Sequence, residues 1–394
     1  MIGCTKLLCG TATVSEAVKY DRDSAKLPPH MLQFSADCRP LVVWNMTNRC
    51  NLKCRHCYLN AEEDAAENEL STAEAKAFIK NLSEMQVPVL LFSGGEPLVR
   101  EDIFELAAYA KALGIRAVLS TNGTLITPEI ARKLKDAGFQ YVGVSIDGTV
   151  ETHDAFRGMQ GAFAQTLQGI KNAQAAGLKT GMRFTVNKLN YQELPFVLEL
   201  AAQEGIPRFC MYHLVYAGRG KDMAELDVTP AESRDIIEML IAKTLDFHQR
   251  GVDMEILTTD NHADGIYILR YIARHLPERV DEVRELLKMH GGCSAGQKMA
   301  NVNHMGNVHA CQFWAHRPLG NVRDRKFSEI WTDKQNQFMC DLRVKTEKVE
   351  GKCGKCGYKE YCGGCRIRAE VIHGNIWGED PACYLTVEEI TKEV

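Results

Sequence analysis

Residues 50–58 read Cys50-Asn51-Leu52-Lys53-Cys54-Arg55-His56-Cys57-Tyr58 and place three cysteines on one short stretch of chain. Three thiolates can hold three irons of a 4Fe–4S cube and leave the fourth iron open to a small molecule. A structural zinc site would require a fourth ligand, and His56 is poorly placed for that role between Arg55 and Cys57. We interpret this stretch, called the cysteine loop below, as a catalytic iron–sulfur site rather than a zinc knuckle.

The cysteine loop directly follows the first of six apolar, β-rich runs that we expect to form strands. These runs are 41–46, 89–92, 117–120, 141–146, 181–186 and 209–214. Helix signals separate them, including a capping box that starts at Ser71 and the helix start at Thr127-Pro128. Repeated strand–helix units predict an α/β fold with a parallel sheet, here a partial (β/α)6 barrel. Active sites of such barrels form on the loops that follow the strands, which is where the cysteine loop lies.

The composition restricts the class of protein further. The chain has 394 residues, a formal net charge of −4 and 15 cysteines. The slight negative charge argues against a nucleic-acid partner. The segment Met1 to Gly10 lacks the apolar core of a signal peptide, and no stretch has the roughly 18–20 apolar residues of a membrane span, so we expect a cytoplasmic protein without a membrane partner. Fifteen cysteines in such a protein indicate metal or cluster ligands rather than disulfides.

A second group of cysteines lies in the last part of the chain, where glycine and cysteine become frequent from Gly291 onward. It reads Cys353-x-x-Cys356-x5-Cys362-x-x-Cys365, with Cys383 beyond it and Cys293 and Cys311 before it. Pairs of the C-x-x-C type serve zinc and iron–sulfur clusters alike, so the spacing alone leaves both open. A loop-rich module of this kind needs its metal to fold. The other cysteines are expected to be small buried residues: Cys4, Cys9, Cys38, Cys210 and Cys340.

The cysteine loop resembles the signature loop of radical S-adenosylmethionine (SAM) enzymes, and the resemblance extends from about Arg39 to Gly220. It implies that SAM chelates the open iron of a 4Fe–4S cluster held by Cys50, Cys54 and Cys57. An electron from that cluster would cleave SAM to a 5′-deoxyadenosyl radical, and Tyr58 would lie by the adenine. The segment Gly94-Gly95-Glu96-Pro97 is similar to a family motif in which the glycines admit the methionine amino group and Glu96 faces the same ammonium.

Polar residues at the later strand ends extend the resemblance. It implies that Asn122, Ser145 and Asp147 contact the ribose or the methionine part of SAM, and that Arg183 pairs with the SAM carboxylate. An arginine inside a barrel requires an anion to offset its burial. Turn chemistry at the strand ends is the alternative explanation for Asn122, Ser145 and Asp147.

The second cysteine group resembles the SPASM module of radical SAM enzymes, except that two residues instead of three separate Cys362 from Cys365. The resemblance implies one closed auxiliary 4Fe–4S cluster on Cys353, Cys356, Cys362 and Cys383. It also implies that Cys293, Cys311 and Cys365 contribute to a second auxiliary cluster, whose presence the shortened interval leaves open. We expect an N-terminal extension at 1–38, the barrel at 39–257, a helical linker at 258–290 and the auxiliary-cluster module at 291–394.

The flanking segments resemble the tetrapyrrole-modifying branch of these enzymes. These segments are Met1–Gly10, Leu27-Pro28-Pro29-His30 and Pro40–Thr47. The resemblance implies a haem-biosynthesis enzyme that removes two acetate side chains from the tetrapyrrole 12,18-didecarboxysiroheme and gives iron-coproporphyrin III. An electron donor such as flavodoxin or ferredoxin would serve it. Arg208, His213 and the stretch Gly218–Lys221 lie near the expected barrel opening, where basic groups could bind substrate carboxylates or simply be solvated.

Three alternatives stay open. Within the tetrapyrrole branch, the reaction could be propionate removal for the dioxo haem of denitrifiers or the synthesis of haem b. A peptide-modifying SPASM maturase is the second, although the segment before Pro40 leaves little room for a leader-binding winged-helix domain. An electron carrier or a zinc-organised interaction module is the third, and a carrier would gain nothing from an open iron.

Overall fold

The computed structural model describes residues 1–11, 39–64 and 67–394. Two features used above, the segment Leu27-Pro28-Pro29-His30 and Cys38, lie outside the described residues. No helix in the described ranges is both long enough and apolar enough to cross a membrane.

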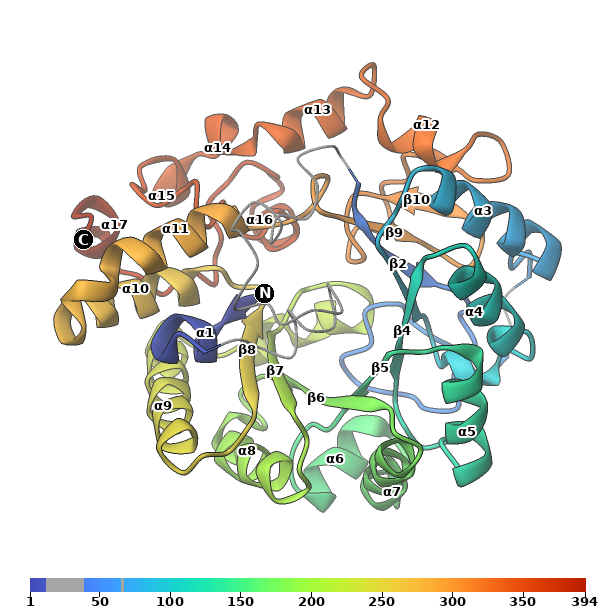
Figure 1. Cartoon of the computed structure of the whole chain (residues 1–394). Coiled ribbons are helices and arrows are strands. Elements are labelled where there is room, and N and C mark those ends of the chain that lie inside the picture. The colour runs from blue at the N-terminus through green and yellow to red at the C-terminus, as the bar shows by residue number, and fades with distance from the viewer. Residues whose placement is uncertain (12–38, 65–66) are drawn as a thin grey trace.

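A single mixed sheet organises the described chain. Its strand order is β1-β8-β7-β6-β5-β4-β3-β2-β9-β10-β11, and β2 to β8 run parallel to one another. Figure 1 shows β2 to β8 as an open arc with helices on its outer side. The strands are β1 Ile2–Gly3, β2 Leu41–Asn45, β3 Val89–Ser93, β4 Arg116–Thr121, β5 Tyr141–Ser145, β6 Lys179–Val186, β7 Arg208–His213, β8 Glu255–Thr259, β9 Met299–Val302, β10 Asn307–His309 and β11 Gly320–Asn321.

The helices connect and cover this sheet. They are α1 Cys4–Cys9, α3 Thr72–Glu84, α4 Ile103–Ala112, α5 Pro128–Ala137, α6 Val150–Arg157, α7 Ala162–Ala175, α8 Leu194–Gln203, α9 Pro230–Gln249, α10 Ala263–His275, α11 Val280–His290, α12 Phe327–Trp331, α13 Gln337–Arg343, α14 Lys345–Lys348, α15 Gly351–Gly354, α16 Arg366–His373 and α17 Val387–Thr391. The capping box at Ser71 and the Thr127 cap both form as the sequence predicts. The partial α/β barrel is therefore confirmed.

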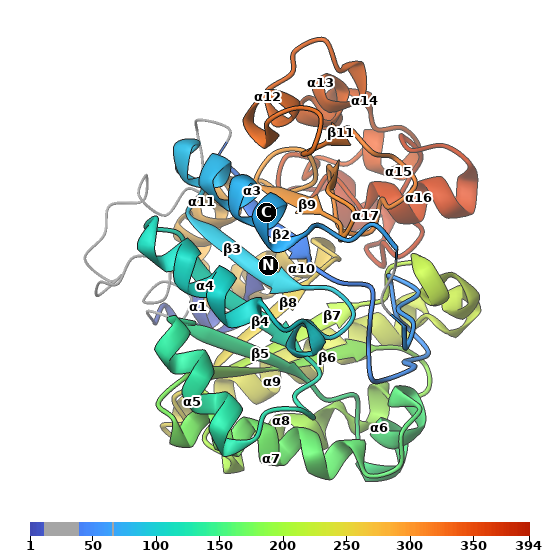
Figure 2. The same cartoon turned by 90° about the vertical axis from the view of Figure 1, so that its right-hand side faces the viewer.

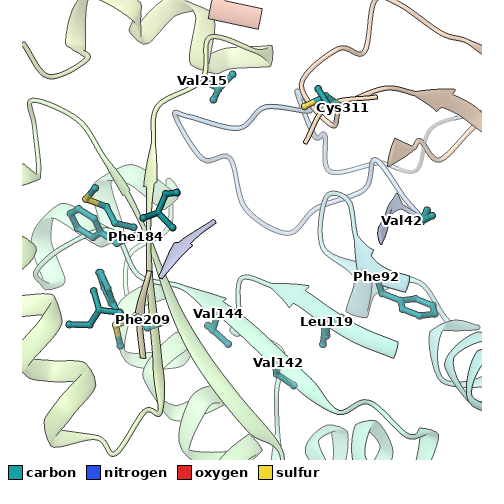
Figure 3. Packing of buried hydrophobic residues seen from close by; sticks show 14 of the residues in the cluster. Val42, Phe92, Leu119, Val142, Val144, Phe184, Phe209, Val215 and Cys311 are labelled. Carbon is teal, nitrogen blue, oxygen red and sulfur yellow. The ribbon is translucent and has the colours of Figure 1, made fainter. Parts of the chain in front are cut away.

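Alternate residues of each strand face opposite sides of the sheet. One set packs in the main core beneath the helices, and Figure 3 labels Phe92, Leu119, Val142 and Phe184 from this set. The other set lines the inside of the arc and mixes apolar residues such as Val43, Leu91 and Val118 with polar ones, which are Arg116, Tyr141, Arg183, Arg208, Tyr212, Glu255 and Thr259. An inner face with this many polar groups is not a packed barrel core, because such groups are buried only when they have partners. It indicates a ligand cavity.

Both edges of the arc hold segments from outside the expected barrel. Strand β8 extends the six expected strands by one and ends just beyond the expected boundary at residue 257, and β1 pairs with it in antiparallel fashion. At the other edge β9 runs parallel to β2, so the C-terminal module continues the same sheet. Figure 2 shows this module, in orange and red, on one side of the barrel.

Candidate active site

The cysteine loop leaves the carboxyl end of β2. Cys50 and Cys54 are buried, Cys57 is half-buried, and the three pack with Leu52 and Met159. The Leu52 amide donates a hydrogen bond to the Cys50 sulfur over 3.4 Å. Burial raises the pKa of the Cys50 thiol to about 12, so binding of a cluster must release a proton from this thiol.

Arg157, the last residue of α6, holds the loop from one side. Its Nη1 donates to the Cys54 sulfur over 3.5 Å, and its Nη2 lies 2.6 Å from a carboxylate oxygen of Asp147. His56 faces the same carboxylate at 3.8 Å. The resemblance implies that Asp147 contacts SAM, but its buried carboxylate is directed at the Arg157 guanidinium and the His56 imidazole. The geometry favours a role for Asp147 in positioning the loop. An arginine at a helix end carries no sequence signal of this role, and Arg157 was missed.

The backbone of Gly94 and Gly95 lies against residues 46–49, which lead into the cysteine loop. A Cβ atom at Gly94 would come within 2.5 Å of the Thr47 carbonyl, and one at Gly95 within 2.2 Å of the Arg49 carbonyl. The Gly95 amide donates to Thr47 O over 2.8 Å. These glycines are needed for the close approach of two protein segments, whereas the sequence suggested the approach of a ligand.

The carboxylate of Glu96 joins the ends of β3 and β4. It is fully buried and accepts hydrogen bonds from the Thr121 hydroxyl at 2.8 Å, the Asn122 amide at 2.8 Å and the Leu98 amide at 3.1 Å. The Asn122 side chain in turn donates to Asn51 of the cysteine loop over 2.8 Å. Glu96 and Asn122 therefore lie beside the loop within one polar network, and their contact with SAM stays a prediction.

Arg183 on β6 reaches across two neighbouring strands. It is paired in register with Ser145 on β5, and its guanidinium group donates to the Ser120 hydroxyl on β4. It passes over Gly143, where an added Cβ would come within 2.4 Å of the guanidinium nitrogen. Tyr58, the last residue of the cysteine loop, is tied to the end of β2, because its hydroxyl donates a hydrogen bond to the Asn45 side chain over 2.9 Å. The structure thus brings Arg183 to the inner face of the sheet, where it lines a cavity.

Two of the basic groups expected at the barrel opening have partners within the protein. Arg219 donates to the carbonyls of Cys54 and Ala61 at 2.8 and 3.0 Å, and so holds the cysteine loop in place. His213 is buried, and its Nε2 lies 2.9 Å from Asp264. Neither residue lines the cavity, whereas Arg208 does and lies 3.4 Å from Glu255.

Four C-terminal cysteines gather around one small space. Cys353, Cys356, Cys362 and Cys383 line it together. The amide of Asp380 donates to the Cys353 sulfur over 3.4 Å, and the amide of Gly364 donates to the Cys362 sulfur over 3.4 Å. Amide donors directed at sulfur stabilise thiolate ligands, so this set fits the closed auxiliary cluster.

The other three candidate ligands, Cys293, Cys311 and Cys365, line a different and larger cavity of 440 Å³. This volume lies in the range of small-molecule sites. Its other walls are the inner face of the strands and the first residues of the chain. Figure 3 shows Cys311 on the C-terminal module above the open end of the arc. A cluster on these cysteines would therefore face the ligand cavity.

The scattered cysteines behave differently from both groups. Cys4 and Cys210 are buried as expected, while Cys9 and Cys340 are only half-buried. Among the residues described, no three His, Cys, Asp or Glu side chains are close enough to share a single metal ion. The fit of the two C-terminal sets to clusters accordingly rests on the cavities that their cysteines line and on the amides directed at sulfur.

Comparison with known families agrees with this architecture. Residues 44–227 match the model of the Radical SAM superfamily, and residues 293–357 match that of the SPASM iron–sulfur cluster-binding domain. The Streptococcus suis protein SuiB, solved bound to S-adenosylmethionine, superimposes with a TM-score of 0.68 at 19% identity, over 88% of this chain and 78% of that chain. This last likeness concerns the fold.

Two similar proteins have names that describe tetrapyrrole chemistry. The Fe-coproporphyrin III synthase of Methanosarcina barkeri is 52% identical over 99% of both chains. The pre-heme d1 synthase of Dinoroseobacter shibae is 41% identical over 89% of this chain and 87% of its own.

Proposed function

The chain belongs to the radical SAM superfamily and carries a SPASM domain, and from this premise we propose that it removes two acetate side chains from 12,18-didecarboxysiroheme. The product would be iron-coproporphyrin III, with methyl groups left at the two positions. The observation that carries the proposal is the 52% identity to an Fe-coproporphyrin III synthase along the whole length of both chains.

The residues that line the cavity match the apolar ring and the carboxylates of this substrate. A tetrapyrrole of this type carries several carboxylates around an apolar ring. The 440 Å³ cavity combines apolar strand residues such as Val43, Leu91 and Val118 with the cation Lys298. The Lys298 ammonium donates to the carbonyls of Met289 and His290 at 2.8 Å. Because carbonyl groups are neutral, they do not cancel the positive charge, and an anionic ligand can still pair with it.

The cysteine loop and the C-terminal cysteines would have different roles in the reaction. Cys50, Cys54 and Cys57 would hold the cluster whose open iron binds SAM, and the bound pair supplies the radical that abstracts hydrogen from substrate. Arg183, held by Ser120, offers a cation to the SAM carboxylate on the inner face of the sheet. Cys353, Cys356, Cys362 and Cys383 would hold a closed cluster suited to electron transfer, and a flavodoxin or ferredoxin would supply electrons.

A panel of tetrapyrroles tests the proposal. The anaerobically reconstituted enzyme is incubated with SAM and dithionite and, separately, with didecarboxysiroheme and with iron-coproporphyrin III, and the products are measured by mass spectrometry. Loss of acetate units from the first substrate and no reaction with the second is expected. Propionate loss from didecarboxysiroheme would instead favour the chemistry of the 41% identical pre-heme d1 synthase, and conversion of iron-coproporphyrin III would favour haem synthesis.

A further inference from the structure

Two histidines line the 440 Å³ cavity among those that the structure describes, His262 and His290. The other described histidines lie elsewhere, and several have clear partners. His56 faces Asp147, His153 accepts from the Asp147 amide at 3.1 Å, and His213 is paired with Asp264. Two described histidines could therefore offer an imidazole to iron in the cavity.

His290 is already engaged by the protein. Its Nε2 lies 2.8 Å from the amino group of Met1, which lines the same cavity. An imidazole whose outward nitrogen is used in this way is a poor candidate for metal binding, because the ligand lone pair and the hydrogen bond compete for the same atom.

His262, in contrast to His290, has no hydrogen-bond partner for its ring among the described residues. It follows β8 at the residue before α10, on the carboxyl side of the strands where barrel active sites form. The residue is 9% exposed, and among the described residues its ring makes a tilted contact with the His290 ring at 5.3 Å and no side-chain hydrogen bond. Burial lowers the pKa of His262 to about 3, and the nearby Asp264 only partly opposes this. The imidazole is therefore neutral at physiological pH.

We propose that His262 is the axial ligand of the iron in the tetrapyrrole substrate. Neutral imidazole is a favoured ligand of haem-type iron, and a buried imidazole without a hydrogen bond gains a partner by binding it. The inference rests on the proposed function, because it requires an iron tetrapyrrole in this cavity. Ligation at His262 would fix the macrocycle at the end of β8, within the cavity that Cys293, Cys311 and Cys365 also line.

The test measures binding rather than turnover. Ferric iron-coproporphyrin III and metal-free coproporphyrin III are each titrated anaerobically into the wild-type holoenzyme, His262→Ala and His290→Ala, with the Soret band and the EPR spin state as readouts. For His262→Ala we expect a shifted Soret band, a changed spin state and at least 10-fold weaker binding of the iron porphyrin. Binding of the metal-free porphyrin should be unchanged, and this shows that the variant is folded. Added imidazole should restore the wild-type spectrum.

The matched variant His290→Ala should keep the wild-type spin state. A wild-type spectrum in His262→Ala, with both porphyrins bound as tightly as before, would overturn the role of His262 and leave the proposed function intact. If neither porphyrin binds to the wild type, the proposed function fails, and the ligand assignment fails with it. As a second variant, His262→Met should bind iron with a thioether in place of imidazole and give a third, distinct spectrum.

Discussion

The guanidinium group of Arg157 donates a hydrogen bond to the sulfur of Cys54 over 3.5 Å. The same group forms a buried ion pair with Asp147 at 2.6 Å, so the end of β5 and the end of α6 are tied to the cysteine loop. Burial raises the pKa of the Cys54 thiol, and the charge of Arg157 opposes that shift. A cation at this place favours the thiolate that a cluster requires.

Removal of Arg157 should therefore affect both stability and cluster assembly. In Arg157→Met the Asp147 carboxylate is left buried without its cation, which should cost about 3–5 kcal/mol in the free energy of unfolding. The double variant Asp147→Asn/Arg157→Met should recover most of that stability, measured by anaerobic urea denaturation. It should still retain less iron at the cysteine loop than the wild type. Full iron retention in the double variant would show that the Arg157–Cys54 contact is incidental.

The two C-terminal cysteine sets should lose iron independently. Cys365→Ala should remove a cluster that faces the cavity, and Cys353→Ala should remove the closed one, each lowering the iron content by about four per chain. Cys340→Ala is the matched control, since Cys340 lies in neither set and its thiol donates to the Lys334 carbonyl at 3.3 Å. Iron analysis with Mössbauer spectroscopy measures this. An unchanged iron content in Cys365→Ala would mean that Cys293, Cys311 and Cys365 hold no cluster.

A single methyl group should displace Arg183. In Gly143→Ala the new Cβ would lie within 2.4 Å of the guanidinium group, while the Gly143 backbone itself is ordinary strand that alanine can adopt. The loss of one charge-assisted contact is worth about 1.5–3 kcal/mol, so the KM for SAM should rise roughly 10- to 100-fold. The control is Gly3→Ala, whose backbone is outside the left-handed region and where the nearest atom to the added Cβ lies at 3.5 Å, an ordinary van der Waals contact. An unchanged KM for SAM in Gly143→Ala would show that Arg183 does not bind SAM.

The buried pair of His213 and Asp264 should make stability depend on pH. Burial lowers the pKa of His213, but the adjoining Asp264 carboxylate outweighs it, so the net pKa lies above its ordinary 6.5. A histidine with a raised pKa stabilises the fold fully below pH 6.5 and loses that contribution as the pH rises through the folded pKa. The stability advantage of the wild type over His213→Gln should thus shrink as the pH rises above 6.5. Thermal unfolding of both proteins checks this, and an advantage that grows with pH would contradict it.

Much of this architecture follows from local sequence signals. The six strands were predictable from runs of apolar residues, and the helices between them from N-cap residues such as Ser71 and Thr127. Both signals lie within a few residues of the element that they predict. Strand β8 was missed because Glu255–Thr259 is short and begins with a charged residue, which pairs with Arg208 inside the cavity. The pairing of β9 with β2 was missed because it joins residues about 250 positions apart, for which a sequence pattern carries no signal.

The residues of the site with a local sequence motif were predicted, and those that act through contacts distant in sequence were not. The cysteines and the Gly94–Glu96 motif have recognisable spacing, and the structure places them together at the carboxyl ends of the strands. Arg157 and Arg219 act on the loop through contacts that are distant in sequence, at helix ends and turns that look unremarkable. The resemblance already placed Arg183 inside the barrel, but its contact with Ser120 across β5 was visible only once the sheet register was known.

The central claim is tested most directly by counting two products in one anaerobic reaction. Wild-type enzyme, SAM, dithionite and didecarboxysiroheme are incubated together, and 5′-deoxyadenosine and the tetrapyrroles are quantified by mass spectrometry. We predict iron-coproporphyrin III formed with about two 5′-deoxyadenosines per macrocycle, one for each acetate removed. Formation of 5′-deoxyadenosine while the tetrapyrrole keeps both acetates would contradict the account and return the choice of substrate to the other branches of the superfamily.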